Sequence, residues 1–62
     1  MEIKTLYTVA EAATTLGLSR SKLYGLMGRG YLPYVLIGRS RRIPAQAIMA
    51  FVQDLLDGRQ VS

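Results

Sequence analysis

The 62-residue sequence contains no cysteine, no histidine and no tryptophan, and it has only four acidic residues. Without cysteine and histidine, the chain cannot form a disulfide, build the usual zinc sites or use the commonest general base of enzymes. Four scattered carboxylates also provide no paired acid and base and no activated nucleophile. The sequence therefore predicts a protein that is not an enzyme and that holds no metal and no cofactor.

Long apolar segments are also missing, since the longest run spans residues 31–37 and is interrupted by Pro33. A membrane-spanning helix needs about 20 apolar residues, and the N-terminus lacks the pattern of a signal peptide. We therefore expect a cytoplasmic protein with no membrane partner. At this length the chain predicts a single domain, residues 1–62, with a core at about 6–57 and a loose C-terminal tail at 59–62.

The positive charge of the chain is concentrated in its middle. Residues 20–42 hold six of the eight lysine and arginine residues and none of the four acids, so the net charge is +6 there and −2 elsewhere. A localised cationic surface attracts polyanions, because each neutralised phosphate releases a counterion. The alternative is an arginine-rich face that only keeps the protein soluble. The elements predicted for this window favour a nucleic-acid partner.

A first helix is predicted over residues 9–16. Thr8 is a good N-cap, and Glu11, three residues later, completes a capping box. Gly17 is suited to the left-handed conformation that ends a helix. The apolar residues of this segment recur at helical spacing and predict one inward stripe, formed by Val9, Ala12, Ala13 and Leu16.

A second helix is predicted to follow after a turn of only three residues. Ser19 serves as its N-cap, and Gly30 stops it. A turn of this length containing glycine is typical of a helix-turn-helix, which presents its second helix to the major groove of DNA. The residues expected to pack inward from this helix are Leu23, Leu26 and Met27.

The next segment predicts a small hairpin and then a third helix. Residues 34–37 favour a strand, residues 38–41 a cationic turn, and residues 42–43 a short return strand. Such a hairpin beside a recognition helix is a wing. Pro44 suits the first turn of a helix that ends before Gly58, and the predicted inward stripe of this helix is Ile48, Phe51, Val52 and Leu55.

An ordered series of short motifs supports this interpretation over nearly the whole chain. The series comprises Leu6-Tyr7-Thr8-Val9-x-Glu11-Ala12-Ala13, Leu16-Gly17-Leu18-Ser19-Arg20-Ser21-x-Leu23-Tyr24, Gly30-x-Leu32-Pro33 and Val35-x-Ile37-Gly38-Arg39-x-x-Arg42-Ile43-Pro44. It resembles the excisionase branch, the recombination directionality factors, of the MerR-like winged helix-turn-helix DNA-binding domains. The resemblance implies a mainly α fold with a small β-hairpin.

The resemblance also implies a function. Excisionases bind attachment-site DNA of a phage or mobile element, bend it and bias a tyrosine or serine integrase toward excision, and they self-associate on DNA. The resemblance also implies that the protein acts inside a bacterial or phage-infected host cell. Three positions depart from the pattern of the family, which often has arginine at Gly25, a cation at Leu36 and an aromatic residue at Arg41. The last departure predicts a shift of charge toward the wing tip.

Two groups of residues are the candidate DNA contacts. In the recognition helix they are Ser19, Arg20, Ser21, Lys22, Tyr24 and Arg29, because the first turns of such a helix meet base edges and phosphates. In the wing they are Gly38, Arg39, Ser40, Arg41 and Arg42, because arginine is preferred where the minor groove narrows. For the Tyr24 ring, contact with DNA and packing over the core remain two equal alternatives.

Two further features leave alternatives open. Gly25 and Gly28 each cost the helix about 0.8 to 1 kcal/mol relative to alanine. Three alternatives explain why glycine is present at these positions: close packing against the wing, a frayed helix end, or close approach of the sugar-phosphate backbone. In the first wing strand, Tyr34 and Leu36 alternate with Val35 and Ile37, so the two pairs lie on opposite faces and one pair risks exposure. That pair is either a docking patch or is covered by the third helix.

Two other functions compete with that of an excisionase. A small transcriptional repressor would use the same surface, and an integrase gene next to this one would argue against it. A protein-interaction adaptor would use the wing strand and the third helix, with incidental arginines. A salt titration separates the adaptor from a DNA-binding protein, because only phosphate contacts make affinity fall steeply with salt.

Overall fold

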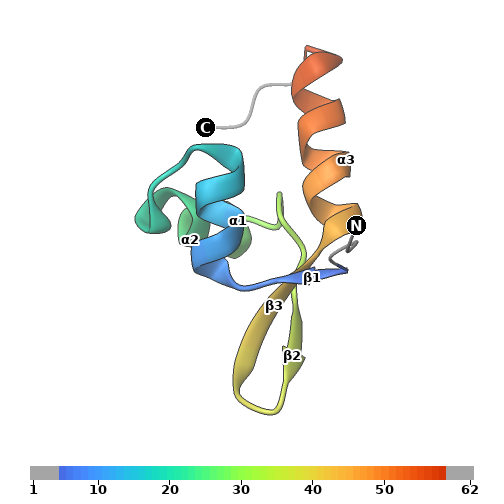
Figure 1. The fold of residues 1–62 in the computed structure, drawn as a ribbon. Coiled ribbons are helices and arrows are strands. Elements are labelled where there is room, and N and C mark those ends of the chain that lie inside the picture. Colours follow the sequence, from blue (N-terminus) through green and yellow to red (C-terminus); the bar gives the residue numbers. More distant parts are fainter. Residues whose placement is uncertain (1–4, 59–62) are drawn as a thin grey trace.

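The computed structural model describes residues 5–58 of the chain. Within these residues it contains three helices and three short strands. In chain order they are β1 (Leu6–Tyr7), α1 (Val9–Leu16), α2 (Arg20–Gly28), β2 (Val35–Ile37), β3 (Ser40–Pro44) and α3 (Ala45–Leu56). Figure 1 shows α1 and α2 on one side, α3 on the other, and the β2–β3 hairpin projecting away from the helices. The architecture confirms the predicted winged helix-turn-helix.

The start of α1 confirms the predicted capping box. The Thr8 hydroxyl accepts a hydrogen bond from the Glu11 amide at 3.0 Å, and the Glu11 carboxylate accepts one from the Thr8 amide at 2.9 Å. At the other end of α1, Gly17 has a φ of 70° and stops the helix in the left-handed conformation. These local interactions define both ends of a helix of only eight residues.

The turn between α1 and α2 is as tight as predicted. The Leu18 amide donates a hydrogen bond back to the Ala13 carbonyl at 2.9 Å, which closes the end of α1. One residue later, the Ser19 hydroxyl accepts a hydrogen bond from the Lys22 amide at 3.1 Å and caps α2. The two caps lie two residues apart, so the sequence of the turn itself sets where α2 begins.

The β2–β3 hairpin, which we call the wing, has a shorter loop than predicted. Ile37 lies opposite Ser40, so only Gly38 and Arg39 form the loop, and β3 begins at Ser40. The predicted four-residue turn and two-residue return strand were therefore wrong. Gly38 has a φ of 63° at the first loop position, which lets the chain reverse within two residues and resume strand pairing at once.

Strand β1 was not predicted. Its two residues pair with the end of β3, Leu6 opposite Pro44 and Tyr7 opposite Ile43, which places β3 in the middle of a three-stranded antiparallel sheet. The Ala45 amide also donates a hydrogen bond to the Thr5 carbonyl at 2.8 Å. The segment preceding α1 therefore anchors the base of the wing.

The core lies where the three helices meet the base of the wing. Its buried residues are Val9, Ala12, Ala13, Leu23, Leu26, Met27, Leu32, Ile43, Ala47, Ile48 and Phe51. Among residues 5–58, no polar or charged residue is buried with them. The predicted inward residues of α1 and α2 are thus confirmed, with Leu16 packed at the margin.

The prediction for α3 was correct for only its first half. Ile48 and Phe51 are buried, whereas Val52 and Leu55 remain 38% and 46% exposed. The reason is that the second half of α3 faces the helix-turn-helix across an open apolar groove of about 390 Å³. Pro44 takes the N-cap position, one residue before the first helical turn in which it was expected.

The predicted loose tail, residues 59–62, lies outside the described residues. Between residues 5 and 58, none of the helices has the length and apolar character required to cross a bilayer.

Candidate nucleic-acid interface

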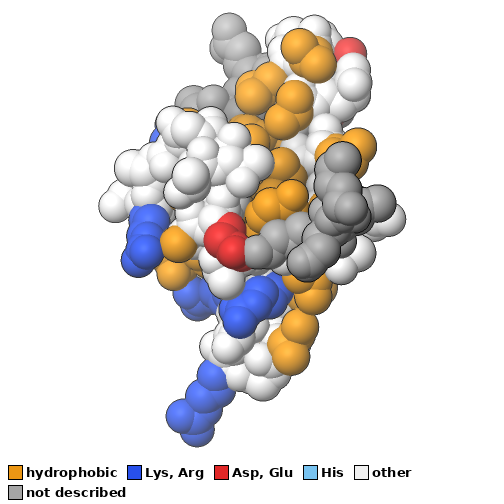
Figure 2. Space-filling model, in the orientation of Figure 1, with side chains coloured by type: hydrophobic (Ala, Val, Ile, Leu, Met, Phe, Trp, Pro, Cys, Tyr) orange, Lys and Arg blue, Asp and Glu red, His pale blue; other side chains and the backbone are white. Residues whose placement is uncertain are grey.

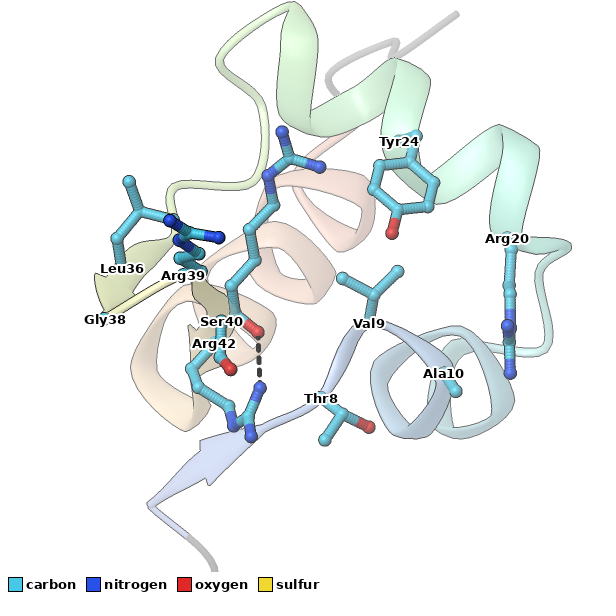
Figure 3. Close-up of a pocket in the computed structure, with 11 residues that line it drawn as sticks. Thr8, Val9, Ala10, Arg20, Tyr24, Leu36, Gly38, Arg39, Ser40 and Arg42 are labelled. Carbon is cyan, nitrogen blue, oxygen red and sulfur yellow. Dashed lines mark hydrogen bonds between the residues drawn. The ribbon is translucent and has the colours of Figure 1, made fainter.

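The start of α2 and the wing border one concave surface. This concavity, the wing cleft, has a volume of about 670 Å³ and also includes the start of α1. Four of its lining side chains are cationic, namely Arg20, Arg39, Arg41 and Arg42. In Figure 3, Arg20 lies at one side of the cleft, Gly38 and Arg39 at the other, and Tyr24 between them. The cations at the head of α2 and those of the wing therefore face a common space.

The cationic side chains of this surface are available to an external anion. Arg20, Lys22, Arg39 and Arg41 are exposed and Arg42 is half-buried. None of them forms a salt bridge with an acidic residue of the described chain. Figure 2 shows the lysine and arginine side chains gathered around the wing and the lower part of the helical body. No acid of residues 5–58 neutralises the charge of these five side chains.

The predicted contacts of α2 divide into two groups. Arg20 and Tyr24 line the wing cleft. Ser21, Lys22 and Arg29 lie instead around a small hollow of about 120 Å³ at Gly25. Helical spacing explains the division, because positions 20 and 24 share one flank of the helix and positions 21, 25 and 29 the next. Ser19 stands at the head of the helix, where its hydroxyl already accepts the capping hydrogen bond from Lys22.

The two glycines of α2 do not pack closely against anything in the described chain. Apart from the chain neighbours and the backbone of α2 itself, no atom lies within 4 Å of a Cβ built on Gly25 or on Gly28. The proposed packing against the wing was therefore wrong. The hollow at Gly25 is open space beside a hydroxyl and two cations. Approach of a sugar-phosphate backbone to this point remains a prediction.

The sequence predicted that Arg41 shifts positive charge toward the wing tip, and this prediction was wrong. Its guanidinium carbon lies 5.6 Å from the centre of the Tyr24 ring and 5.8 Å from the centre of the Tyr34 ring. Both distances fall within the range of a cation–π interaction. Tyr24 is 46% exposed, and contact of its ring with DNA remains a prediction. Sequence reasoning missed the cluster because its members come from α2, the loop before β2 and β3.

The remaining wing residues are arranged around the two-residue loop. Gly38 and Arg39 form the loop, and Ser40 opens β3. The Arg42 guanidinium donates a hydrogen bond to the Arg41 carbonyl at 3.0 Å, which is drawn as a dashed line in Figure 3. Arg42 therefore lies against its own strand, whereas Arg39 is the arginine carried by the loop.

Strand β2 leaves apolar side chains exposed on both of its faces. Leu36 is 62% exposed on the face of Arg41, and Ile37 is 55% exposed on the other. The alternative in which the third helix covers one pair was therefore wrong, because Val35 and Tyr34 also remain exposed. A docking role for this strand remains a prediction.

Comparison with known families agrees with this geometry. Residues 6–55 match the family described as "Helix-turn-helix domain". The chain belongs to this helix-turn-helix family. Its match spans all the elements that form the core, the turn and the wing. Membership in this family of DNA-binding domains confirms the prediction that the chain is not an enzyme.

Named relatives refine the type of helix-turn-helix. A protein of Streptomyces ambofaciens named "Excisionase" is 39% identical over 51 residues, which cover 82% of each chain. A protein of Saccharopolyspora erythraea named "Probable excisionase" is 47% identical over 53 residues, 86% of this chain. A Mycobacterium tuberculosis relative named "Putative DNA-binding protein" is 44% identical over 52 residues, which cover 84% of this chain and 62% of the relative. These relatives support an excisionase-type helix-turn-helix.

The extent of the match differs between these relatives. The chain spans 54% of the length of the Saccharopolyspora protein. No solved structure matches the chain.

Proposed function

We propose that this chain binds DNA sequence-specifically, with α2 in a major groove and the wing in the adjacent minor groove or on its phosphates. The observation that carries the proposal is the wing cleft, in which Arg20 of α2 and Arg39 of the wing face the same open space. A duplex seated there meets both elements at once. In a helix-turn-helix, the N-terminal residues of the second helix contact base edges.

Within α2, each candidate residue has a role suited to its chemistry. Arg20 or Lys22 contacts guanine O6 and N7, and an arginine pair of this kind contributes about 1 to 3 kcal/mol of discrimination. Ser19, Ser21 and Arg29 bind phosphates on either side. Gly25 lets the sugar-phosphate backbone approach the helix at the hollow formed by Ser21, Lys22 and Arg29.

Within the wing, the loop carries the contact with the minor groove. Arg39 follows Gly38 at the tip and inserts where the groove narrows, because the negative potential is strongest there. Ser40 and Arg42 lie at the same side of the hairpin and bind the flanking phosphates. The wing therefore contributes affinity, and α2 contributes most of the base readout.

At the biological level, the proposed role is that of an excisionase of a phage or mobile element. The protein binds repeated sites in attachment-site DNA, bends the duplex, associates with further copies of itself there and biases a tyrosine or serine integrase toward excision. Relatives named as excisionases support this role. The bend is what the resemblance to excisionases implies, and the extra contacts that a bend permits offset the cost of deforming the DNA.

Footprinting and salt titration on DNA flanking an adjacent integrase gene test the proposal. Contacts to about five phosphates predict a log-log slope of affinity against salt near −4.5. We expect protection of repeated sites and a bent, cooperatively formed complex in a gel-shift assay. A flat salt response would favour the adaptor function. Protection only at a promoter, without bending, would favour the repressor.

A further inference from the structure

Arg41 connects the wing to the recognition helix. Its guanidinium lies over the ring of Tyr24 in α2 and over the ring of Tyr34 in the loop before β2. All three side chains are exposed, so this cluster lies at the surface of the protein and not in its core. It contributes an aromatic contact between two elements that both line the wing cleft.

The register of the wing explains why the Arg41 side chain reaches α2. Arg41 lies opposite Leu36 in the antiparallel pair, so its side chain is on the same face as that of Leu36. Tyr34, two residues before Leu36, continues this face and is the diagonal neighbour of Arg41. On β3, the same face continues to the buried Ile43, so Arg41 lies at the edge of the core, beside Tyr24 of α2.

Few other interactions hold the wing at a given angle to α2. The backbone of α2 packs mainly against α1, whereas β3 packs against β1, α1 and α3. The wing is therefore anchored at its base. A contact placed beyond the buried Ile43 fixes the angle between the wing and α2 more effectively than one at the base.

We propose that Arg41 is a positioning residue that holds the wing at the angle at which Arg39 and α2 reach one duplex. Arg41 acts through Tyr24 and Tyr34 and does not neutralise a phosphate. This inference rests on the proposed DNA-binding function. Arginine suits the role because its planar guanidinium stacks on aromatic faces, which the compact ammonium of lysine does less well.

Salt-dependent DNA binding separates positioning from phosphate contact. Arg39→Gln is the matched control, because it removes the same charge from the same hairpin without breaking an aromatic contact. We expect Arg39→Gln to make the log-log salt slope less negative by about 0.9, as for one lost phosphate. We expect Arg41→Gln to weaken binding about tenfold with the slope unchanged, as the loss of two cation–π contacts would do. A slope reduced as in Arg39→Gln, or an unchanged affinity, would overturn the inference.

A second measurement does not depend on DNA. In NMR spectra of the free protein, ring currents should shift the side-chain protons of Arg41 upfield of those of Arg39. Tyr24→Phe keeps a ring at this position and should preserve most of the shift, whereas Tyr24→Leu should reduce it. Unshifted Arg41 protons in the unmodified protein would overturn the inference.

The two experiments also separate this inference from the proposed function. A protein with shifted Arg41 protons but no salt-dependent binding to any DNA would disprove the DNA-binding function and retain the aromatic contact. A protein that binds DNA with unshifted Arg41 protons would disprove the role of Arg41 alone.

Discussion

Ile37 and Ser40 lie directly opposite each other in the wing and leave only Gly38 and Arg39 between them. This pairing gives the hairpin the shortest common type of loop, whose first position requires a positive φ. Gly38 satisfies the requirement with a φ of 63°. Arg39 is therefore held at the end of the hairpin by the conformation of its neighbour.

Replacing Gly38 with alanine should weaken both the fold and the wing. An L-residue at positive φ costs about 1 to 2 kcal/mol, and the loop can avoid this cost only by moving Arg39. We expect the midpoint of urea unfolding to fall and DNA affinity to decrease. An unchanged unfolding midpoint would contradict the assigned loop conformation.

Replacing Gly25 with alanine should have opposite effects on stability and on binding. Beyond the chain neighbours and the backbone of α2, the new methyl group meets nothing within 4 Å in the described chain, and Gly25 does not have a positive φ. We expect unfolding experiments to show a gain of about 0.8 to 1 kcal/mol from helix propensity. DNA affinity should fall roughly tenfold, or about 1.4 kcal/mol, because the methyl group occupies the space proposed for the sugar-phosphate backbone.

Gly28→Ala is the matched control for this prediction. Gly28 is the last residue of α2, its built Cβ also meets nothing, and it does not line the hollow at Gly25. We expect this variant to bind DNA as tightly as the unmodified protein. If Gly25→Ala also retains full affinity, the backbone of the DNA does not approach α2 at that point.

The two proposed roles of Ser19 can be separated by substitution. Asparagine and aspartate cap helices about as well as serine, so Ser19→Asn and Ser19→Asp should both retain the stability of the protein within about 0.5 kcal/mol. Only aspartate introduces a negative charge beside the proposed phosphate path, and we expect it to weaken binding roughly tenfold relative to asparagine. Equal DNA affinities of the two variants would place Ser19 away from the DNA.

The helix-turn-helix was predictable because its signals are local. The capping residues Thr8, Glu11 and Ser19 each act within three residues of their partners, and Gly17 ends α1 by its own backbone conformation. The apolar spacing of α1 and α2 identified their buried faces for the same reason. Such interactions depend on the nearest turn of the chain and little on the rest of the fold.

The features that sequence reasoning missed depend on residues that are distant in the chain. Strand β1 has only two residues, too few to show alternation, and exists because β3 offers it a partner. The exposure of Leu55 depends on where α3 lies relative to the helix-turn-helix. The placement of Arg41 over Tyr24 requires the register of the wing and the orientation of α2 together.

The central claim is that α2 and the wing contact one duplex in adjacent grooves. Because the chain has no cysteine, Ser21→Cys in α2 and Ser40→Cys in β3 each create a single attachment point for a DNA-cleaving reagent. On a footprinted site, we predict cleavage from position 21 in a major groove and from position 40 in the neighbouring minor groove, about half a helical turn or 5 base pairs away. Cleavage from only one position, or from positions separated by more than about one turn of 10 base pairs, would contradict the claim.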